Sequence, residues 1–196
     1  MTSNLRPAIV LVALFTLLTG LAAPLAFVGI GRVVLPYQSG GSLIERDGRV
    51  IGSALLGQSF TEARYFQGRP SATTDTDPAD ASKTVPAPYN AGASSGSNAG
   101  PTSKALLDRV TADVAKAGPL PVPGDAVTTS ASGLDPHVSP ETAARQVARV
   151  AAARNLPEAQ VRALLAGNTH GRLLGLIGEP RVDVLALNLA LDAAKP

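Results

Sequence analysis

Apolar residues are concentrated in one uninterrupted run near the start of the chain. Residues 7–31, which lie between Arg6 and Arg32, carry no charged side chain. Because a helix rises about 1.5 Å per residue, about 20 apolar residues are enough to cross a bilayer. The pattern therefore predicts a single transmembrane helix over residues 8–30.

A cleaved signal peptide is the alternative interpretation of this run. Such a peptide has an apolar core of about 7–15 residues, followed by a cleavage site of the small-x-small type. The run is longer than that, and its alanines, at positions 8, 13, 22, 23 and 26, are never two residues apart. The sequence therefore predicts an uncleaved membrane anchor.

Small residues recur inside the predicted span at helical spacing. Thr16, Gly20 and Ala23 form one face along which another helix can approach closely. Pro24 removes one helical hydrogen bond and is expected to kink the helix. The alternative to a partner-binding face is a bare anchor that contacts only lipid.

The residues after the span alternate between helical and strand patterns. Asp47-Gly48 separates two short apolar runs within residues 42–56, which is typical of a hairpin closed by a type I′ turn. Apolar periodicity, caps and glycine stops predict three helices, over residues 102–117, 140–154 and 157–167, and a terminal helix over 188–192. Strands are expected over residues 125–130 and 181–185. Such a mixture without a repeated β-α-β order predicts one α+β extramembrane domain over residues 31–196.

Residues 73–100 show little periodicity and are rich in Ser, Thr, Asp, Pro and Gly. This composition predicts an extended, mobile loop. We expect its first half, residues 73–87, to move and its second half to dock on the domain.

Composition excludes several classes of function. The chain has no cysteine, which rules out disulfides, thiolate metal sites and a cysteine nucleophile. A net charge of +2 and the absence of tryptophan argue against a nucleic-acid partner. The two histidines lie far apart in the sequence, so no metal site is expected.

The segment around His137 invites comparison with a serine hydrolase. Asp135 lies two residues away, and Ser130 and Ser132 are near in sequence. However, the Gly-x-Ser-x-Gly motif that presents a nucleophilic serine is absent from the sequence. Asp135-Pro136 is instead typical of a turn, and Ser139-Pro140 of a helix start, so no catalytic residue is predicted.

A glycine-rich stretch over residues 92–101 precedes a predicted helix, where backbone N–H groups can bind phosphate. It lacks the Gly-Lys-Ser/Thr ending of a Walker A loop, so a turn-rich connector is the alternative.

The charges that flank the span give a weak indication of orientation. Arg6 precedes it, whereas the arginines after Arg32, at positions 46 and 49, are mixed with Glu45 and Asp47. The positive-inside rule therefore favours a cytoplasmic N-terminus and an external body.

Short motifs along the whole chain, in their order, resemble one family. They are Asn4–Ala8, Gly41–Ile44, Gly52–Phe60, Tyr65–Ala72, Pro88–Asn90, Ser95–Asn98, Ser130–His137 and Leu187–Asp192. In this order after one anchor, they resemble KdpC, the C subunit of bacterial Kdp potassium-transporting ATPases. The stretch Thr74–Pro86 is longer than the resemblance predicts and is interpreted as an insertion.

The resemblance implies a non-catalytic subunit of an ATP-driven potassium importer in the cell (inner) membrane. Its implied partners are a channel-like K⁺-translocating subunit, a P-type catalytic subunit and a very small membrane peptide. It further implies a catalytic chaperone that raises the ATP affinity of the catalytic subunit through a ternary complex with ATP, without a covalently bound cofactor. On this interpretation, the nucleotide or partner contacts are expected at Gln58 and at Ser94, Ser95, Gly96, Ser97 and Asn98. A membrane-anchored structural module or a hydrolase, unrelated to transport, is the alternative.

Overall fold

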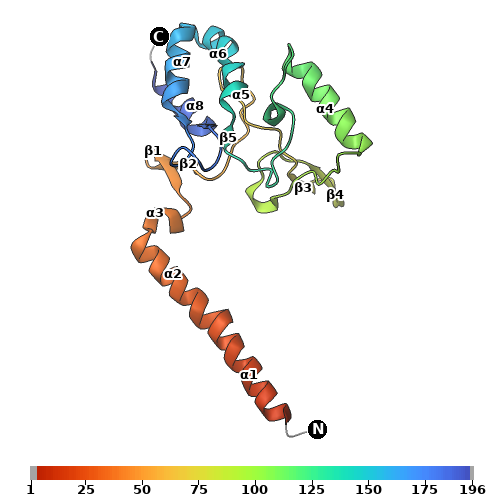
Figure 1. Cartoon of the computed structure of the whole chain (residues 1–196), viewed down its shortest axis with the longest axis vertical. Coiled ribbons are helices and arrows are strands. Elements are labelled where there is room, and N and C mark those ends of the chain that lie inside the picture. The colour runs from red at the N-terminus through yellow and green to blue at the C-terminus, as the bar shows by residue number, and fades with distance from the viewer. Residues whose placement is uncertain (1–3, 195–196) are drawn as a thin grey trace. The chain divides into compact units, whose positions relative to one another are not determined.

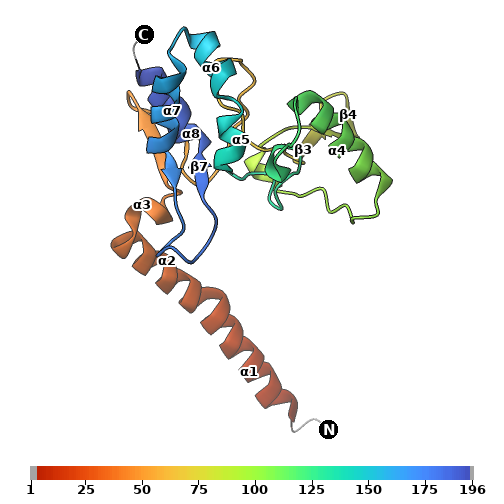
Figure 2. The ribbon, with the colours of Figure 1, turned by 45° about the horizontal axis from the view of Figure 1, so that its top comes forward.

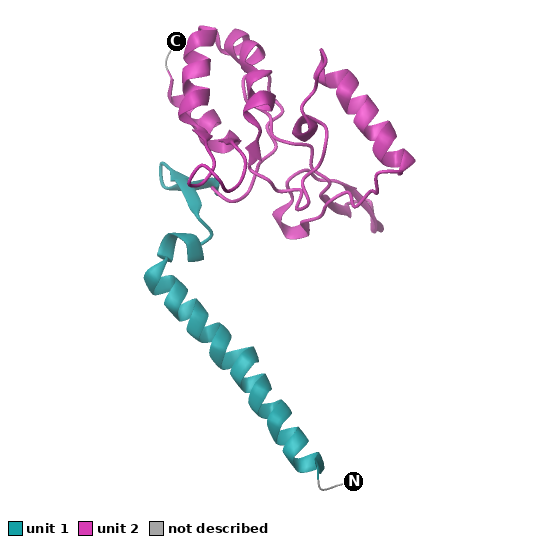
Figure 3. Ribbon diagram, viewed as in Figure 1, with its two compact units in different colours: residues 1–53 teal, residues 54–196 magenta. Residues whose placement is uncertain are grey.

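The structure is a computed structural model, and it describes residues 4–194 of the chain. The chain divides into two compact units, residues 1–53 and residues 54–196 (Figure 3).

Unit 1 begins with a long apolar helix (Figure 1). It consists of α1 (Leu5–Leu17), a π-helical turn (Leu18–Ala22) and α2 (Ala23–Val34). The 30 residues from Leu5 to Val34 have a mean hydropathy of 2.3 in their most apolar window, and they are long and apolar enough to cross a membrane. The structure therefore confirms the apolar helix, which extends beyond residues 8–30 at both ends.

The π-helical turn ends two residues before Pro24, which occupies the first turn of α2. A proline has no N–H to donate to the residue four positions earlier, and its ring crowds that carbonyl group. A π turn inserts one extra residue into the helix and so accommodates the missing hydrogen bond. The structure thus has a π turn close to Pro24, and the kink expected there stays a prediction.

The rest of unit 1 is a short helix and a hairpin. After α3 (Pro36–Ser39), strands β1 (Leu43–Arg46) and β2 (Arg49–Ser53) pair antiparallel with Arg46 opposite Arg49. Asp47 and Gly48 form the turn with φ values of 53° and 72°, as a type I′ turn requires. The predicted hairpin is confirmed.

The core of unit 2 combines a small sheet with four helices. The sheet has the antiparallel order β5 (His137–Val138), β7 (Arg181–Asp183) and β6 (Thr169–His170). Helix α7 (Glu158–Gly167) contacts α5 (Pro140–Ala144), α6 (Val147–Arg154) and α8 (Val184–Ala193). The buried core includes Phe66, Val147, Val150, Val161, Leu187 and Leu191. This mixture of helices and strands confirms the α+β class.

A second lobe of unit 2 carries α4 (Lys104–Ala117) and the hairpin of β3 (Thr74–Asp77) and β4 (Asp80–Pro86). In Figures 1 and 2 it lies to one side of α5–α8. The helix predicted over residues 102–117 is confirmed, and Ser103 caps it, since Ser103 Oγ accepts a hydrogen bond from Leu106 N. No residue of α4 is fully buried.

Three local predictions were wrong. A hairpin occupies residues 74–86, where a loop was expected, because these polar strands pair by backbone hydrogen bonds while exposing both faces. Mobility of this segment stays a prediction.

The strand expected over residues 125–130 is instead a 3-10 turn, Gly124–Ala126, followed by irregular chain. The carboxylate of Asp125 accepts hydrogen bonds from Ser139 N, Ser139 Oγ and Thr142 Oγ1. These bonds hold the segment against the start of α5 and replace strand pairing.

The helix expected over residues 140–154 is divided into α5 and α6 at Arg145 and Gln146. Arg145 donates to the carbonyls of Ala117, Pro119 and Pro121. Gln146 exchanges two hydrogen bonds with the backbone of Gln67. These long-range bonds anchor the break between the two helices.

Candidate functional site

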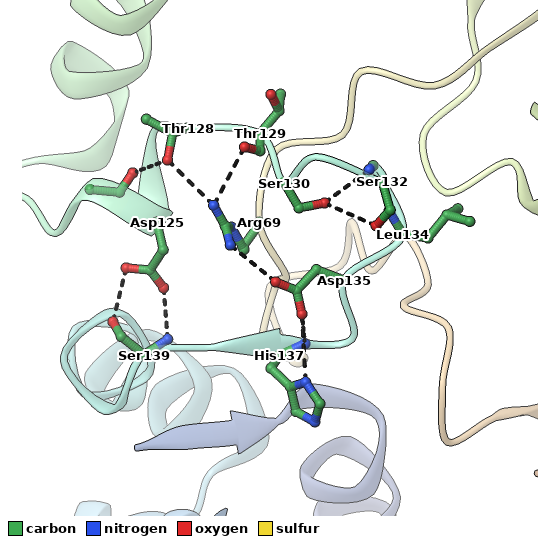
Figure 4. Close-up of polar contacts among 12 residues, drawn as sticks. Arg69, Asp125, Thr128, Thr129, Ser130, Ser132, Leu134, Asp135, His137 and Ser139 are labelled. Atoms are coloured by element: carbon green, nitrogen blue, oxygen red, sulfur yellow. Dashed lines mark hydrogen bonds and ion pairs between the residues drawn. The ribbon is translucent and has the colours of Figure 1, made fainter. Parts of the chain in front are cut away.

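A cluster of connected polar groups in unit 2 surrounds Arg69 (Figure 4). Arg69 lies in the extended segment after Phe66, and its guanidinium reaches the chain between Gly124 and β5. Nη1 donates to Asp135 Oδ2 at 3.0 Å, and Nη2 lies 3.5 Å from Thr128 Oγ1 and 3.4 Å from Thr129 O. Arg69 thus joins two segments that are far apart in the sequence.

Asp135 is the anionic partner in this cluster. Its Oδ1 accepts a hydrogen bond from His137 N at 3.0 Å and lies 3.5 Å from His137 Nδ1. Partial burial raises the pKa of Asp135, but the hydrogen bonds from His137 and the Arg69 guanidinium outweigh it and hold the pKa below its ordinary value. Asp135 is therefore ionised at neutral pH and forms an ion pair with Arg69.

Tyr89 closes the cluster from a third segment. Its hydroxyl donates to Arg69 O at 2.8 Å, and its backbone N–H donates to Ser71 Oγ. Burial, with a smaller contribution from the charge of Asp135, raises the pKa of Tyr89 to about 12. A hydroxyl that stays protonated is a stable donor, so Tyr89 holds the backbone of Arg69 in place.

The segment Ser94–Asn98 docks against the loop Ser130–Gly133. Ser95 N and Ser94 Oγ both donate to Ser132 O at 3.0 Å, while Ser95 Oγ donates to Ala72 O. A Cβ on Gly96 would lie only 2.8 Å from Ala131 O, so the backbones approach closely here. Ser97 and Asn98 remain exposed.

Gln58 lies in a separate segment that contacts the other end of the 130–135 stretch. The preceding residue, Gly57, donates its N–H to Leu134 O at 2.8 Å. Gln58 and the 94–98 segment are therefore brought to one stretch, residues 130–135, from opposite ends. A nucleotide or partner contact at these residues stays a prediction.

The arrangement does not form a hydrolytic triad. Ser130 Oγ accepts from Gly133 N, Ser132 Oγ accepts from Leu134 N, and Ser139 Oγ donates to Asp125. His137 faces Asp135, and none of these described hydroxyl bonds involves it. Within residues 4–194 there is also no group of three or more His, Asp or Glu side chains that could hold a metal ion.

Sequence reasoning missed Arg69, Tyr89 and Asp135 as site residues. Each lies in one of the motifs that carry the family resemblance, which was the available signal. Two hollows border Arg69: one of about 450 Å³ that includes Tyr89, and one of about 580 Å³ that includes Leu134. Arg69 Nε is buried and has no hydrogen-bond partner among the described residues. The site holds separate segments of the chain together, and its residues are not arranged for covalent chemistry.

Comparison with known proteins gives a consistent result along the whole chain. The family model described as "KdpC: K+-transporting ATPase, c chain" matches residues 5–193. A potassium-transporting ATPase KdpC subunit from Rhodopseudomonas palustris is 63% identical over 199 aligned positions that cover all of both chains. Those from Methylobacterium nodulans and Bradyrhizobium diazoefficiens are each 62% identical, over 98% and 99% of this chain and 98% of their own lengths.

Proposed function

The chain belongs to the KdpC family of K⁺-transporting ATPase subunits, and from this premise we propose that it assembles and stabilises such a transporter and raises the ATP affinity of its catalytic subunit. It is an accessory subunit and not the catalytic one. The observation that carries the proposal is the match over residues 5–193, which includes both the apolar helix and the whole body.

The proposed partners follow from this role. They are a channel-like K⁺-translocating subunit, a P-type catalytic subunit and a small membrane peptide. ATP is bound by the catalytic subunit, so that this chain belongs to the ternary complex without touching the nucleotide. The helix face of Thr16, Gly20 and Ala23 is the proposed contact within the membrane. A Cβ on Gly20 would meet nothing within 4 Å in this chain, so the chain itself leaves room for a neighbouring helix.

The charges around the helix support an external body. Arg6 precedes the helix without a neighbouring acid, whereas Arg46 and Arg49 after it are mixed with Glu45 and Asp47. Cytoplasmic ATP cannot reach an external body. The proposed effect on ATP affinity is then transmitted by the membrane helix to the partner subunits. The helix contacts one conformational state of these subunits more favourably and so shifts them toward that state.

Protease digestion of right-side-out sealed vesicles tests the orientation. We expect added protease to degrade the body while the vesicles are intact. A body that resists digestion until the vesicles are lysed contradicts the external placement.

Two variants of the assembled transporter test the route of coupling. We expect Gly20→Leu to weaken the apparent ATP affinity of the K⁺-stimulated ATPase by roughly fivefold or more, since couplings between sites typically start at this size. Ser97→Ala removes one exposed loop hydroxyl and should leave the affinity unchanged.

If the loop variant weakens the ATP affinity and Gly20→Leu does not, the nucleotide contact belongs to the loop. A transporter purified without this chain provides the reference. If adding the chain back leaves ATP affinity unaltered, the catalytic chaperone role is wrong.

A further inference from the structure

The connection between β6 and β7 exposes a compact group of aliphatic side chains. Its tip, residues 173–177, has the sequence Leu-Leu-Gly-Leu-Ile. Leu174 and Leu176 are each 84% exposed, and Leu173 and Ile177 are 64% and 62% exposed. In Figure 2 this blue connection projects from the sheet as a narrow loop. Exposed apolar patches of this kind mark interaction surfaces.

Part of the backbone of the tip is hydrogen-bonded within the turn itself. Leu173 and Ile177 exchange two hydrogen bonds, at 2.9 and 3.0 Å. Leu176 N donates to Leu173 O, and Gly175 N donates to Arg172 O. Four N–H groups are therefore satisfied inside the turn. These bonds lower the cost of placing the turn near lipid, and the groups that they leave, such as Leu174 N–H, suit an interfacial depth where headgroups and water can bind them.

The charged groups of this connection lie at its base. Arg172 Nη2 and Glu179 Oε2 form an ion pair at 2.7 Å, which closes the neck of the loop. Residues 173–178, between these two, carry no charged side chain. The result is an apolar tip above a polar collar, the profile of a segment that lies at a membrane interface.

We propose that the tip Leu173–Ile177 inserts into the lipid bilayer that the chain's own apolar helix crosses. Leu and Ile are among the residues most favourable in the bilayer interior. A domain tethered to the membrane also meets lipid at a high effective concentration. Protein interfaces instead rely on Trp, Tyr and Arg anchors, and Leu is under-represented among them. The tip has only aliphatic residues and glycine. The proposal requires the membrane anchor but not the effect on ATP affinity.

The natural chain has no tryptophan, so a single introduced tryptophan reports one position. We would reconstitute full-length Leu174→Trp alone into vesicles of phosphatidylcholine and phosphatidylglycerol. A second set of vesicles carries bromine near the headgroup end of the acyl chains, because interfacial segments enter roughly 5–10 Å. We expect a blue-shifted emission that loses most of its intensity in the brominated vesicles.

Leu107→Trp is the matched control, since Leu107 is an exposed leucine on α4. It should emit as in water and keep its intensity. Adding Leu176→Asp to Leu174→Trp should abolish the quenching while circular dichroism stays unchanged. Quenching of Leu174→Trp no stronger than that of the control overturns the proposal. A blue shift that arises only in the assembled transporter, without quenching by lipid, overturns it in favour of a protein partner.

Discussion

Tyr89 lies against two glycines whose missing side chains leave room for its ring. A Cβ on Gly57 would clash with this ring and would also lie 2.7 Å from Asp135 O. A Cβ on Gly68 would clash with the Tyr89 hydroxyl. The position of the Tyr89 ring therefore depends on glycine at both sites, and so does the hydrogen bond that Tyr89 donates to Arg69 O.

Gly57→Ala is expected to destabilise the protein by about 1–3 kcal/mol, the usual penalty of overpacking. Urea unfolding of the full chain in detergent measures the change. Gly124→Ala is the matched control, because nothing lies within 4 Å of a Cβ there. Equal stability of the two variants contradicts close packing around Tyr89.

The ion pair of Arg69 and Asp135 should make stability depend on pH. The pKa of Asp135 is lowered in the folded protein, so the unfolded chain takes up a proton first as pH falls. The contribution is therefore complete above the ordinary aspartate pKa of about 3.9 and is lost as pH falls through the lower folded value.

Asp135→Asn tests this contribution. Its deficit in unfolding free energy relative to the wild type should be constant near neutral pH and shrink in acid. Urea titrations at a series of pH values measure the deficit. A deficit that grows as pH falls has the wrong sign for a carboxylate with a lowered pKa.

Helices that bury one face in the core were among the predictable elements. Helix α6 could be predicted from its apolar pattern, since the apolar residues Val147, Val150 and Ala151 are the ones that it buries. The β3–β4 hairpin could not be predicted in this way. None of its strand residues is fully buried, so hydrophobic alternation is absent, and its order comes from backbone pairing.

The same exposure predicts that the hairpin contributes little to the stability of unit 2. Thr74 and Pro86 are paired, so a Gly-Gly link can replace residues 75–85 without moving its ends. We expect the unfolding free energy to change by less than about 1 kcal/mol, as is usual for changes to exposed chain. A larger loss in urea unfolding contradicts the peripheral role of the hairpin.

At the scale of the whole molecule, the fold of unit 2 depends on contacts between distant parts of the sequence. The buried side chain of Asn188 on α8 accepts from Phe66 N at 2.8 Å and donates to Phe66 O at 2.9 Å. Arg69 and Asp135 are likewise distant in the sequence. Composition and periodicity predict the apolar helix, the α+β class and most helices. They cannot reveal the candidate site, because pairs such as Arg69 and Asp135 meet only after folding.

Asn188→Ala should destabilise the protein by about 2–4 kcal/mol, since it leaves two buried backbone groups of Phe66 without their partner. Gln146→Ala offers a comparison, because Gln146 makes the same pair of bonds to Gln67 at a more exposed position. Gln146→Ala should lower the free energy of unfolding by less, as measured by urea unfolding. A smaller effect of Asn188→Ala than of Gln146→Ala contradicts the assigned importance of burial.

The turn of the β3–β4 hairpin also offers a practical handle on the assembled transporter. Pro78 and Ala79 are exposed at its tip, and exposed loop tips tolerate insertions. A short peptide tag that accepts one fluorophore can be inserted there without disturbing the Arg69 cluster or the core. Counting the photobleaching steps of single labelled particles would then give the number of copies of this chain in each assembly.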